Sequence, residues 1–323
     1  YWGGVNAVVE AMRNVGAVGA TPHAITDCLC FGNPEKPQQM WEFVESVRGV
    51  ADACRAVTLK DNPDHATPII AGNVSFYNES KTGAIPPSPI VSCLGRLKDV
   101  NKTVPMYFQK SESILIMIGE RKDELGGSVY YSLFNELGAH VPRPDLEEVK
   151  NQIFALTDCV DEGLILSCHD IADGGVAATL AEMMIGNEIG CEANIPGNYS
   201  ADKLLFSESG GFVVEVLQEN ANPIKSVFAT YDLKADVIGN TTEHQVIEIN
   251  NVIRLSIRKA KDMWMNGLRE KLEILSNERS ELLLRIETVS TMRQEAFRQA
   301  FTEVDKHFRE IFANLSDGDG FLQ

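Results

Sequence analysis

The chain has 323 residues, of which 44% are hydrophobic and 23% are charged, a composition typical of soluble globular proteins and a length that suggests about two domains. Its 29 basic and 46 acidic residues give a formal net charge of −17, which argues against binding to the phosphate backbone of nucleic acids because such binding needs positive surface. The sequence has no uninterrupted apolar run of about 18 residues, so it predicts no transmembrane helix.

The cysteines favour a reducing compartment. There are seven of them, an odd number with no CxxC pair. Cys28 and Cys30 are too closely spaced for the usual zinc knuckle, and His23 is the only nearby residue that would support a metal. Reduced thiols in a buried core are the favoured interpretation. Because no signal peptide can be read at the beginning either, we expect a cytoplasmic protein.

The first predicted region, residues 1–110, mixes helices with short apolar strands. Apolar residues at helical spacing predict helices over 6–15 and 40–56, the second with its apolar face at 40, 43, 44, 47, 50, 51 and 54. Short apolar runs next to Gly and Pro predict buried strands at 24–26, 68–71 and 89–95. The polar segment 58–66 is interpreted as a loop insertion.

The second predicted region, residues 111–265, alternates strands and helices more regularly. Continuous apolar runs predict buried strands at 113–119, 163–168 and 212–217. Helical spacing predicts helices over 146–162 and 176–185. The alternation makes both regions α/β or α+β in class.

The third predicted region, residues 266–323, is different. Residues 268–315 contain no Pro or Gly, and their apolar residues recur at steps of three and four with an irregularity near Arg293. This pattern predicts a long coiled-coil-like helix of roughly 70 Å. Its apolar seam would need a partner helix.

Two candidate sites in the first region follow predicted strands. Asp27 precedes the turn Phe31-Gly-Asn-Pro34, where an exposed carboxylate could take Mg²⁺ or a nucleotide group. The alternative is an Asp that stabilises a turn. In the next strand, Gly72 would allow close backbone approach, and Asn73 and Ser75 supply oxygen atoms of the kind that bind Mg-phosphate. No Walker Lys follows, and an ordinary strand-to-turn junction is equally consistent.

Two more candidates lie in the second region. Asp170 and Asp173 follow a strand and precede Gly174-Gly175, which opens a helix whose amino terminus attracts anions. Glu208 precedes another glycine pair, Gly210-Gly211. Carboxylates beside glycine turns suit phosphate with Mg²⁺. His169 could act as a base, although a lone His is more often structural.

These segments also carry a family resemblance. GGVNAVVEAMRN, AITDCLCFGNP, GNVSFYNES, LGGSVYY, HDIADGGVAATLAEM and LFSESGG resemble the second half of the synthetase component of phosphoribosylformylglycinamidine synthase, over residues 1 to about 270. The resemblance implies N- and C-terminal domains like those of aminoimidazole ribonucleotide synthetase. It also implies that Asp27 and Gly72 contact ATP, Asn73 binds Mg²⁺ and Ser75 contacts substrate. Asp170, Asp173 and Glu208 match an auxiliary magnesium or phosphate site.

The activity that the resemblance implies is ATP-dependent conversion of formylglycinamide ribonucleotide to the amidine, with ammonia derived from glutamine. The implied partners are the amino-terminal half of the synthase, a glutaminase subunit and a small bridging subunit. The family's catalytic His lies in that other half, so no catalytic residue is assigned and the chain alone is expected to be inactive. The alternative is a nucleotide-binding scaffold or coiled-coil interaction protein derived from this fold.

The tail carries a second resemblance. The segment from Phe301 to Gly318, with the heptad seam before it, is similar to the point where the returning coiled coil of chromosome-maintenance (SMC) ATPases enters the head domain. A generic charged amphipathic helix is the alternative. The sequence is consistent with three origins of the tail: a natural fusion, an assembly join or an engineered join.

Overall fold

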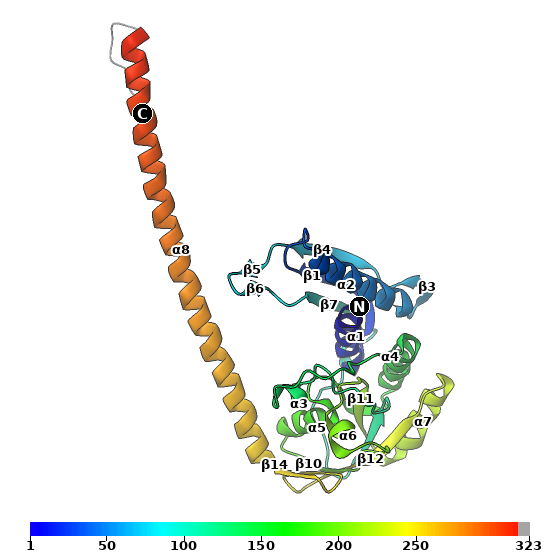
Figure 1. Cartoon of the computed structure of the whole chain (residues 1–323). Helices are drawn as coiled ribbons and strands as arrows, with labels where there is room; N and C mark the ends of the chain where they lie inside the picture. The colour runs from blue at the N-terminus through cyan, green and yellow to red at the C-terminus, as the bar shows by residue number, and fades with distance from the viewer. Residues whose placement is uncertain (316–323) are drawn as a thin grey trace. The chain divides into compact units, whose positions relative to one another are not determined.

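The structure, a computed structural model, describes residues 1–315; the last residues of the SMC-like segment, from Ser316, lie outside this range. The chain forms two compact units, Tyr1–Lys261 and a second that begins at Asp262 (Figure 1). Within residues 1–315, no helix combines the length and hydrophobicity that crossing a bilayer requires.

A three-stranded sheet organises the first part of the larger unit. Its central strand pairs with a parallel strand on one side and an antiparallel strand on the other. The elements are α1 (Trp2–Ala17), β1 (Thr21–Cys30), α2 (Pro37–Ala56), β4 (Ile69–Ser75) and β7 (Ser88–Arg96), in the sheet order β4-β1-β7. The stripe Val5, Val8, Val9 and Met12 of α1 is fully buried, because this face of the helix meets the hydrophobic core.

Several predictions for this part are wrong in detail. β4 and β7 were predicted to be buried, yet Ile70 and Ile90 are each 57% exposed. β4 and β7 are the two edges of the sheet, where fewer neighbours cover the side chains. The apolar face of α2 is also shifted: Met40, Val44 and Val47 are exposed, and the buried residues are Ser46, Gly49, Val50, Ala53 and Cys54.

The predicted loop 58–66 is instead a hairpin of β2 (Thr58–Leu59) and β3 (Asn62–Ala66). Lys60 in its turn donates hydrogen bonds to Phe154 O at 2.7 Å and to Asp158 Oδ1 at 2.6 Å. The polar segment 58–66 thus forms a paired hairpin through its backbone, and the side chain of Lys60 joins this hairpin to α4. The other short elements here are β5 (Glu79–Ser80), β6 (Gly83–Ala84) and the 3₁₀ turn η1 (Val100–Lys102).

A seven-stranded mixed sheet organises the rest of the larger unit, in the order β14-β13-β10-β12-β8-β11-β9. Its strands are β8 (Ile114–Ile118), β9 (Ile165–Asp170), β10 (Gly190–Ala193), β11 (Phe212–Val216), β12 (Ala235–Thr242), β13 (Val246–Ile249) and β14 (Ile253–Ser256). The helices are α3 (Val129–Ser132), α4 (Leu146–Asp161), α5 (Gly175–Ile185), α6 (Ala201–Phe206), α7 (Ala221–Thr230) and the 3₁₀ turn η2 (Gln218–Asn220). The predicted strands β8, β9 and β11 and the helices α4 and α5 are confirmed.

Helices cover both faces of this sheet. Ile116 and Ile118 of β8 belong to one core cluster with α1, α2, α4 and α7, whereas Leu115 and Met117 belong to a second cluster with α5. Successive side chains of a strand point to opposite faces, so β8 is buried on both sides, as its continuous apolar run predicts. The first cluster joins residues from both sides of position 110, and the boundary expected there stays a prediction.

A buried carboxylate fixes the connection into the second sheet. Glu215 is fully buried and accepts hydrogen bonds from the backbone N–H groups of Gln109 and Lys110 and from the hydroxyls of Ser113 and Ser167. A buried charge needs such complete satisfaction. Glu215 therefore anchors the segment between the two sheets.

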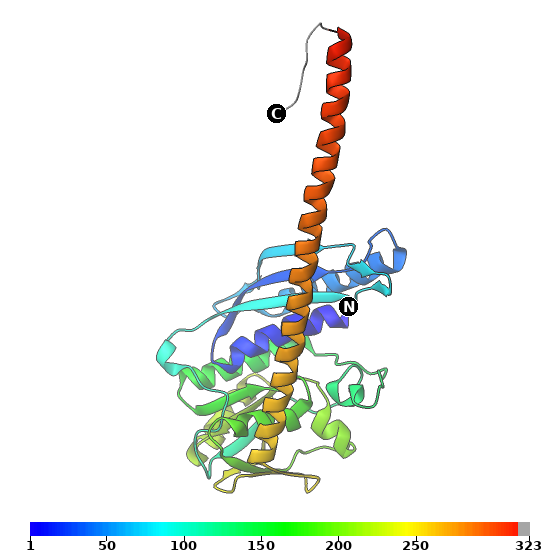
Figure 2. The same ribbon diagram turned by 90° about the vertical axis from the view of Figure 1, so that its left-hand side faces the viewer.

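The predicted long helix is confirmed and begins earlier than expected, as α8 (Ile257–Leu315) (Figure 2). Its seam is open to solvent in the single chain: Leu282 is 58% exposed, Val289 62% and Phe297 70%. Propensity alone rarely supports such a long single helix, so its apolar seam needs another surface.

Candidate functional site

Asp27 and Gly72 are neighbours across the parallel strands β1 and β4. A Cβ built on Gly72 would lie 2.7 Å from Asp27 Oδ1, so only glycine leaves the carboxylate this room. Partial burial raises the pKa of Asp27, and a hydrogen bond from the backbone N–H of Asn73 opposes that rise. This pair is the first half of the predicted site.

Asn73 and Ser75 lie on the same strand but face the other way. Asn73 is paired with Cys28, and its Nδ2 donates to Cys28 Sγ at 3.6 Å. Asn78 contacts Ser75, because its Nδ2 donates a hydrogen bond to the backbone oxygen of Ser75 at 2.8 Å. Because side chains alternate along a strand, Asn73 and Ser75 lie on the face opposite to Asp27.

Asp27, Gly72 and Asn73 were expected to lie at the ends of their strands, and this expectation is wrong. Asp27 lies inside β1, and Gly72 and Asn73 lie inside β4. Both strands continue until Phe31 N–H donates to Ser75 O at 2.9 Å. The backbones of all three residues are adjacent, but their side chains do not converge on one face.

A cleft of about 270 Å³ lies between α1 and the loops of the second sheet. We call it the α1 cleft. Its lining comes from α1, two glycine-containing loops and two of the predicted carboxylates: Trp2, Gly3, Asn6, Glu10, Arg13, Gly126, Gly127, Val141, Pro142, Ile171, Ala172, Asp173 and Glu208. Asp173 and Glu208, more than 30 residues apart in the sequence, are thus brought together.

Glu208 joins two helix starts at this cleft. Its Oε1 accepts hydrogen bonds from the backbone N–H of Gly174 at 2.9 Å and of Val129 at 2.9 Å. Gly174 has φ 77°, in the left-handed region that favours glycine, and it caps α5. Burial raises the pKa of Glu208, although these two N–H groups oppose the rise.

Two further polar residues that line this cleft, Glu10 and Arg13, were not among the predicted site residues. Partial burial raises the pKa of Glu10. The nearby carboxylates of Asp173 and Asp170 raise this pKa further, whereas Arg13 lowers it. Arg13 is buried, and its Nε has no hydrogen-bond partner within the described residues. The signal was available as an acidic and a basic residue one turn apart on a helix. The cleft therefore offers both carboxylates and a guanidinium.

Asp170 does not line the α1 cleft. It is buried, and His169 Nδ1 lies 3.2 Å from its Oδ1, while His169 Nε2 lies 3.1 Å from Glu182 Oε2. Burial lowers the pKa of His169, but the two carboxylates outweigh it and raise the pKa to about 10. His169 is therefore protonated near neutral pH and is not a general base there.

The donor chemistry of the cleft suits a hard cation bound together with phosphate. Among residues 1–315, no cluster of three or more His, Cys, Asp or Glu side chains is arranged to hold a metal by itself. Mg²⁺ usually takes one or two carboxylates and completes its shell with water and phosphate oxygens. Asp173 and Glu208 fit that requirement.

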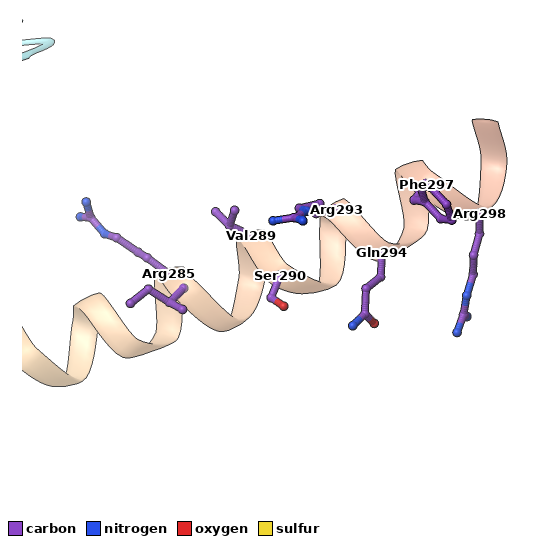
Figure 3. Close-up of a pocket in the computed structure, with 8 residues that line it drawn as sticks. Arg285, Val289, Ser290, Arg293, Gln294, Phe297 and Arg298 are labelled. Carbon is purple, nitrogen blue, oxygen red and sulfur yellow. The ribbon is translucent and has the colours of Figure 1, made fainter. Parts of the chain in front are cut away.

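Another concave patch lies on α8 alone. Figure 3 shows Val289, Arg293 and Phe297 on one side of the helix. All the residues that line the patch belong to this helix: Arg285, Ile286, Val289, Ser290, Arg293, Gln294, Phe297 and Arg298. A surface of one helix is not an enclosed site, and it marks the exposed seam.

Two family models match this chain. Residues 1–97 match the N-terminal domain and residues 110–250 the C-terminal domain of AIR synthase related proteins. Phosphoribosylformylglycinamidine synthase subunit PurL of Methanothrix thermoacetophila is 45% identical over 276 residues, 84% of this chain and 36% of that protein. The chain thus spans about a third of the length of the curated relatives it matches.

Solved structures share the fold. T. maritima PurL complexed with FGAR superposes with a TM-score of 0.64 at 16% identity, covering 80% of this chain and 42% of that one. The same protein complexed with ATP gives a TM-score of 0.61 at 18% identity, covering 80% and 41%. α8 lies entirely beyond the regions that the two family domains match, and its similarity to SMC proteins stays a prediction.

Proposed function

Because this chain belongs to the AIR synthase related proteins, we propose that it is a nucleotide-binding portion of a phosphoribosylformylglycinamidine synthase. The complete enzyme would use ATP to phosphorylate the amide oxygen of formylglycinamide ribonucleotide, and ammonia from glutamine would displace the phosphate. The strongest support is the 45% identity to a PurL subunit, together with carboxylates, glycine turns and a helix start at one cleft.

In this proposal the two groups of site residues have different roles. Asp27, with Gly72 leaving it room, contacts ATP; Asn73 is a neutral oxygen ligand for Mg²⁺, and Ser75 contacts substrate. Asp173 and Glu208 hold Mg²⁺ with a phosphate at the auxiliary α1 cleft, where Arg13 offsets the negative charge. Asp170 is assigned to the same auxiliary site by the family resemblance, although it contacts His169 and does not line the cleft.

Bound Mg²⁺ would neutralise phosphate charge. The chain's own groups then position the nucleotide: the backbone N–H groups at the start of α5 face an anion favourably, and the close approach at Gly72 fixes the Asp27 carboxylate. The other substrate contacts and the acid–base chemistry would come from the amino-terminal half of the synthase. The further partners are a glutaminase subunit and a small bridging subunit, in the cytoplasm.

Calorimetry with MgATP tests the binding role. The chain should bind MgATP, and Asp27→Asn, Asn73→Ala and Asp173→Asn should each weaken it, whereas the exposed variant Glu219→Gln serves as the matched control. If all variants bind as tightly as the parent chain, the site assignment is wrong.

An activity assay tests the incompleteness of the chain. With formylglycinamide ribonucleotide, ATP and ammonia, the isolated chain should form no amidine, because catalysis depends on holding both sides of the reaction in place. Measurable turnover by this chain alone would contradict the proposal.

A second candidate function is a helix-mediated interaction. The exposed seam of α8, with Leu282, Val289 and Phe297, favours a coiled coil with another helix. In that case the α/β part would be a scaffold, and loss of nucleotide binding would leave the association of the chain unchanged.

A further inference from the structure

Two half-buried thiols lie in contact on one face of β1. Cys28 and Cys30 are separated by one residue, so they lie on the same face of the strand. Their Sγ atoms are 3.7 Å apart and share a hydrogen bond. Both side chains are half-buried, whereas Cys54, Cys159, Cys168 and Cys191 are buried. This pair is therefore the most accessible place for a dithiol to react within the described residues.

The shared hydrogen bond distinguishes this pair from the third half-buried thiol, Cys93. The hydrogen bond with Cys28 is the largest cause that raises the pKa of Cys30, and burial adds to it. Either thiol can be the donor of this hydrogen bond. The remaining half-buried thiol differs, because burial raises the pKa of Cys93 to about 11.

The same sulfur contacts a residue of the proposed nucleotide site. Asn73 Nδ2 donates to Cys28 Sγ at 3.6 Å, and Cys28 follows Asp27 in the strand that pairs with Gly72 and Asn73. A covalent change at the sulfur of Cys28 would alter its contact with the Asn73 side chain directly and would displace Asp27 through the backbone that joins the two residues.

We propose that Cys28 and Cys30 form a reversible disulfide that controls binding at the β1–β4 strand pair. Each thiol loses one proton and one electron, and an S–S bond forms between the two sulfur atoms. One molecule of hydrogen peroxide accepts the two protons and two electrons and becomes two molecules of water. The control of binding rests on the proposed function; the disulfide itself does not.

The strand geometry explains why the bond is reversible and why it has an effect. Residues two apart in a strand have Cα atoms about 6.6 Å apart, at the upper end of the range of about 4.4 to 6.8 Å that a disulfide spans. The bond therefore needs β1 to contract, and strained disulfides are the easily reduced ones. Contraction between Cys28 and Cys30 shifts their register against Asn73 and Ser75.

Peptide mass analysis after peroxide treatment tests the disulfide. The tryptic peptide 14–48 contains Cys28 and Cys30 and no other cysteine. In the full chain it should lose the mass of two hydrogens, resist alkylation, and recover both on reduction. Cys28→Ser and Cys30→Ser should abolish this change, and Cys93→Ser should leave it intact. A peptide that stays fully alkylated, or that is oxidised only to sulfinic acid, would overturn the proposal.

Calorimetry on reduced and oxidised chain tests the effect on binding. The oxidised chain should bind MgATP at least about tenfold more weakly, and Cys30→Ser, which keeps the Asn73 contact with Cys28, should bind equally before and after peroxide. Equal affinities of the two states, with the disulfide formed, would contradict the control of binding. No binding by the reduced chain would instead contradict the proposed function, while the mass result would still decide the disulfide.

Discussion

The absent side chain of Gly72 makes room for the carboxylate of Asp27. The two residues are paired across parallel strands, and a Cβ on Gly72 would come within 2.7 Å of Asp27 Oδ1. The contact involves the end of a short side chain, so an alanine there displaces the carboxylate rather than the backbone. This makes the pair a sensitive test of whether Asp27 serves binding or only structure.

Gly72→Ala should therefore weaken MgATP binding about tenfold, about 1.4 kcal/mol, with little change in the melting temperature. The matched control is Gly267→Ala, where a Cβ would meet nothing within 4 Å. Calorimetry and thermal unfolding of both variants check this. An unchanged affinity for Gly72→Ala would show that the position of the Asp27 carboxylate does not matter for ATP.

The binding of MgATP should also depend on pH. Burial raises the pKa of Glu208 above its usual value, and burial and neighbouring carboxylates raise that of Glu10. A cation needs these groups deprotonated, so affinity should fall as the pH drops through their raised pKa values, above the range of an ordinary glutamate. Calorimetry between pH 8 and pH 5 measures this dependence.

Glu208→Gln provides the control for that experiment. It keeps an oxygen that can accept the N–H groups of Gly174 and Val129 but cannot titrate. Binding should be weaker in this variant and less dependent on pH. The same steep dependence in the variant would place the responsible group elsewhere.

His169 should stabilise the protein through its charge. Its folded pKa of about 10 lies above its ordinary value of 6.5, so its contribution is complete below about pH 6.5 and is lost as the pH rises through about 10. His169→Gln should lower the free energy of unfolding by about 2 kcal/mol at pH 6 and by clearly less at pH 9.5. Urea unfolding at both values measures it, with the exposed His23→Gln as control; an equal loss at both would argue against the charge.

The seam of α8 should drive association. The full chain should self-associate in light scattering, or lose helix content if it stays a monomer, while a chain that ends at Glu273 should be monomeric. Leu282→Gln, on the seam, should weaken association more than Leu284→Gln, which lies off the seam and is similarly exposed. If both chains are monomers and the tail keeps its full helical signal, the argument from an unsatisfied seam is wrong.

Elements buried on both faces were predictable from the sequence. The run Ile114–Ile118 is apolar throughout because helices cover both sides of β8. The strands of the smaller sheet carried similar residues, such as Ile70 and Ile90, but these are exposed on edge strands. Hydrophobicity along the chain does not reveal how many layers cover a strand. The hairpin at 58–66 was missed because its strands pair through backbone groups and carry no apolar alternation that would reveal them.

The candidate carboxylates were also visible in the sequence, because each stands beside a glycine turn. What was missed is a residue with an ordinary local pattern: Arg13 lies on a helix with no loop motif, and only the fold places it beside Asp173. The face on which Asn73 lies also depends on the register of β4 against β1, and a shift of one residue reverses every side chain.

The sequence by itself determined the family, the order of the α/β elements and the long terminal helix, because these depend on local motifs and on periodic apolar residues. Only the tertiary structure decided which polar groups meet: Asp173 with Glu10 across the α1 cleft, Asp27 with Gly72 on one face of a strand pair, and Cys28 with Asn73 on the other. The physical reason is that hydrophobic burial is set residue by residue, whereas a contact between distant polar groups is set by strand register and helix packing.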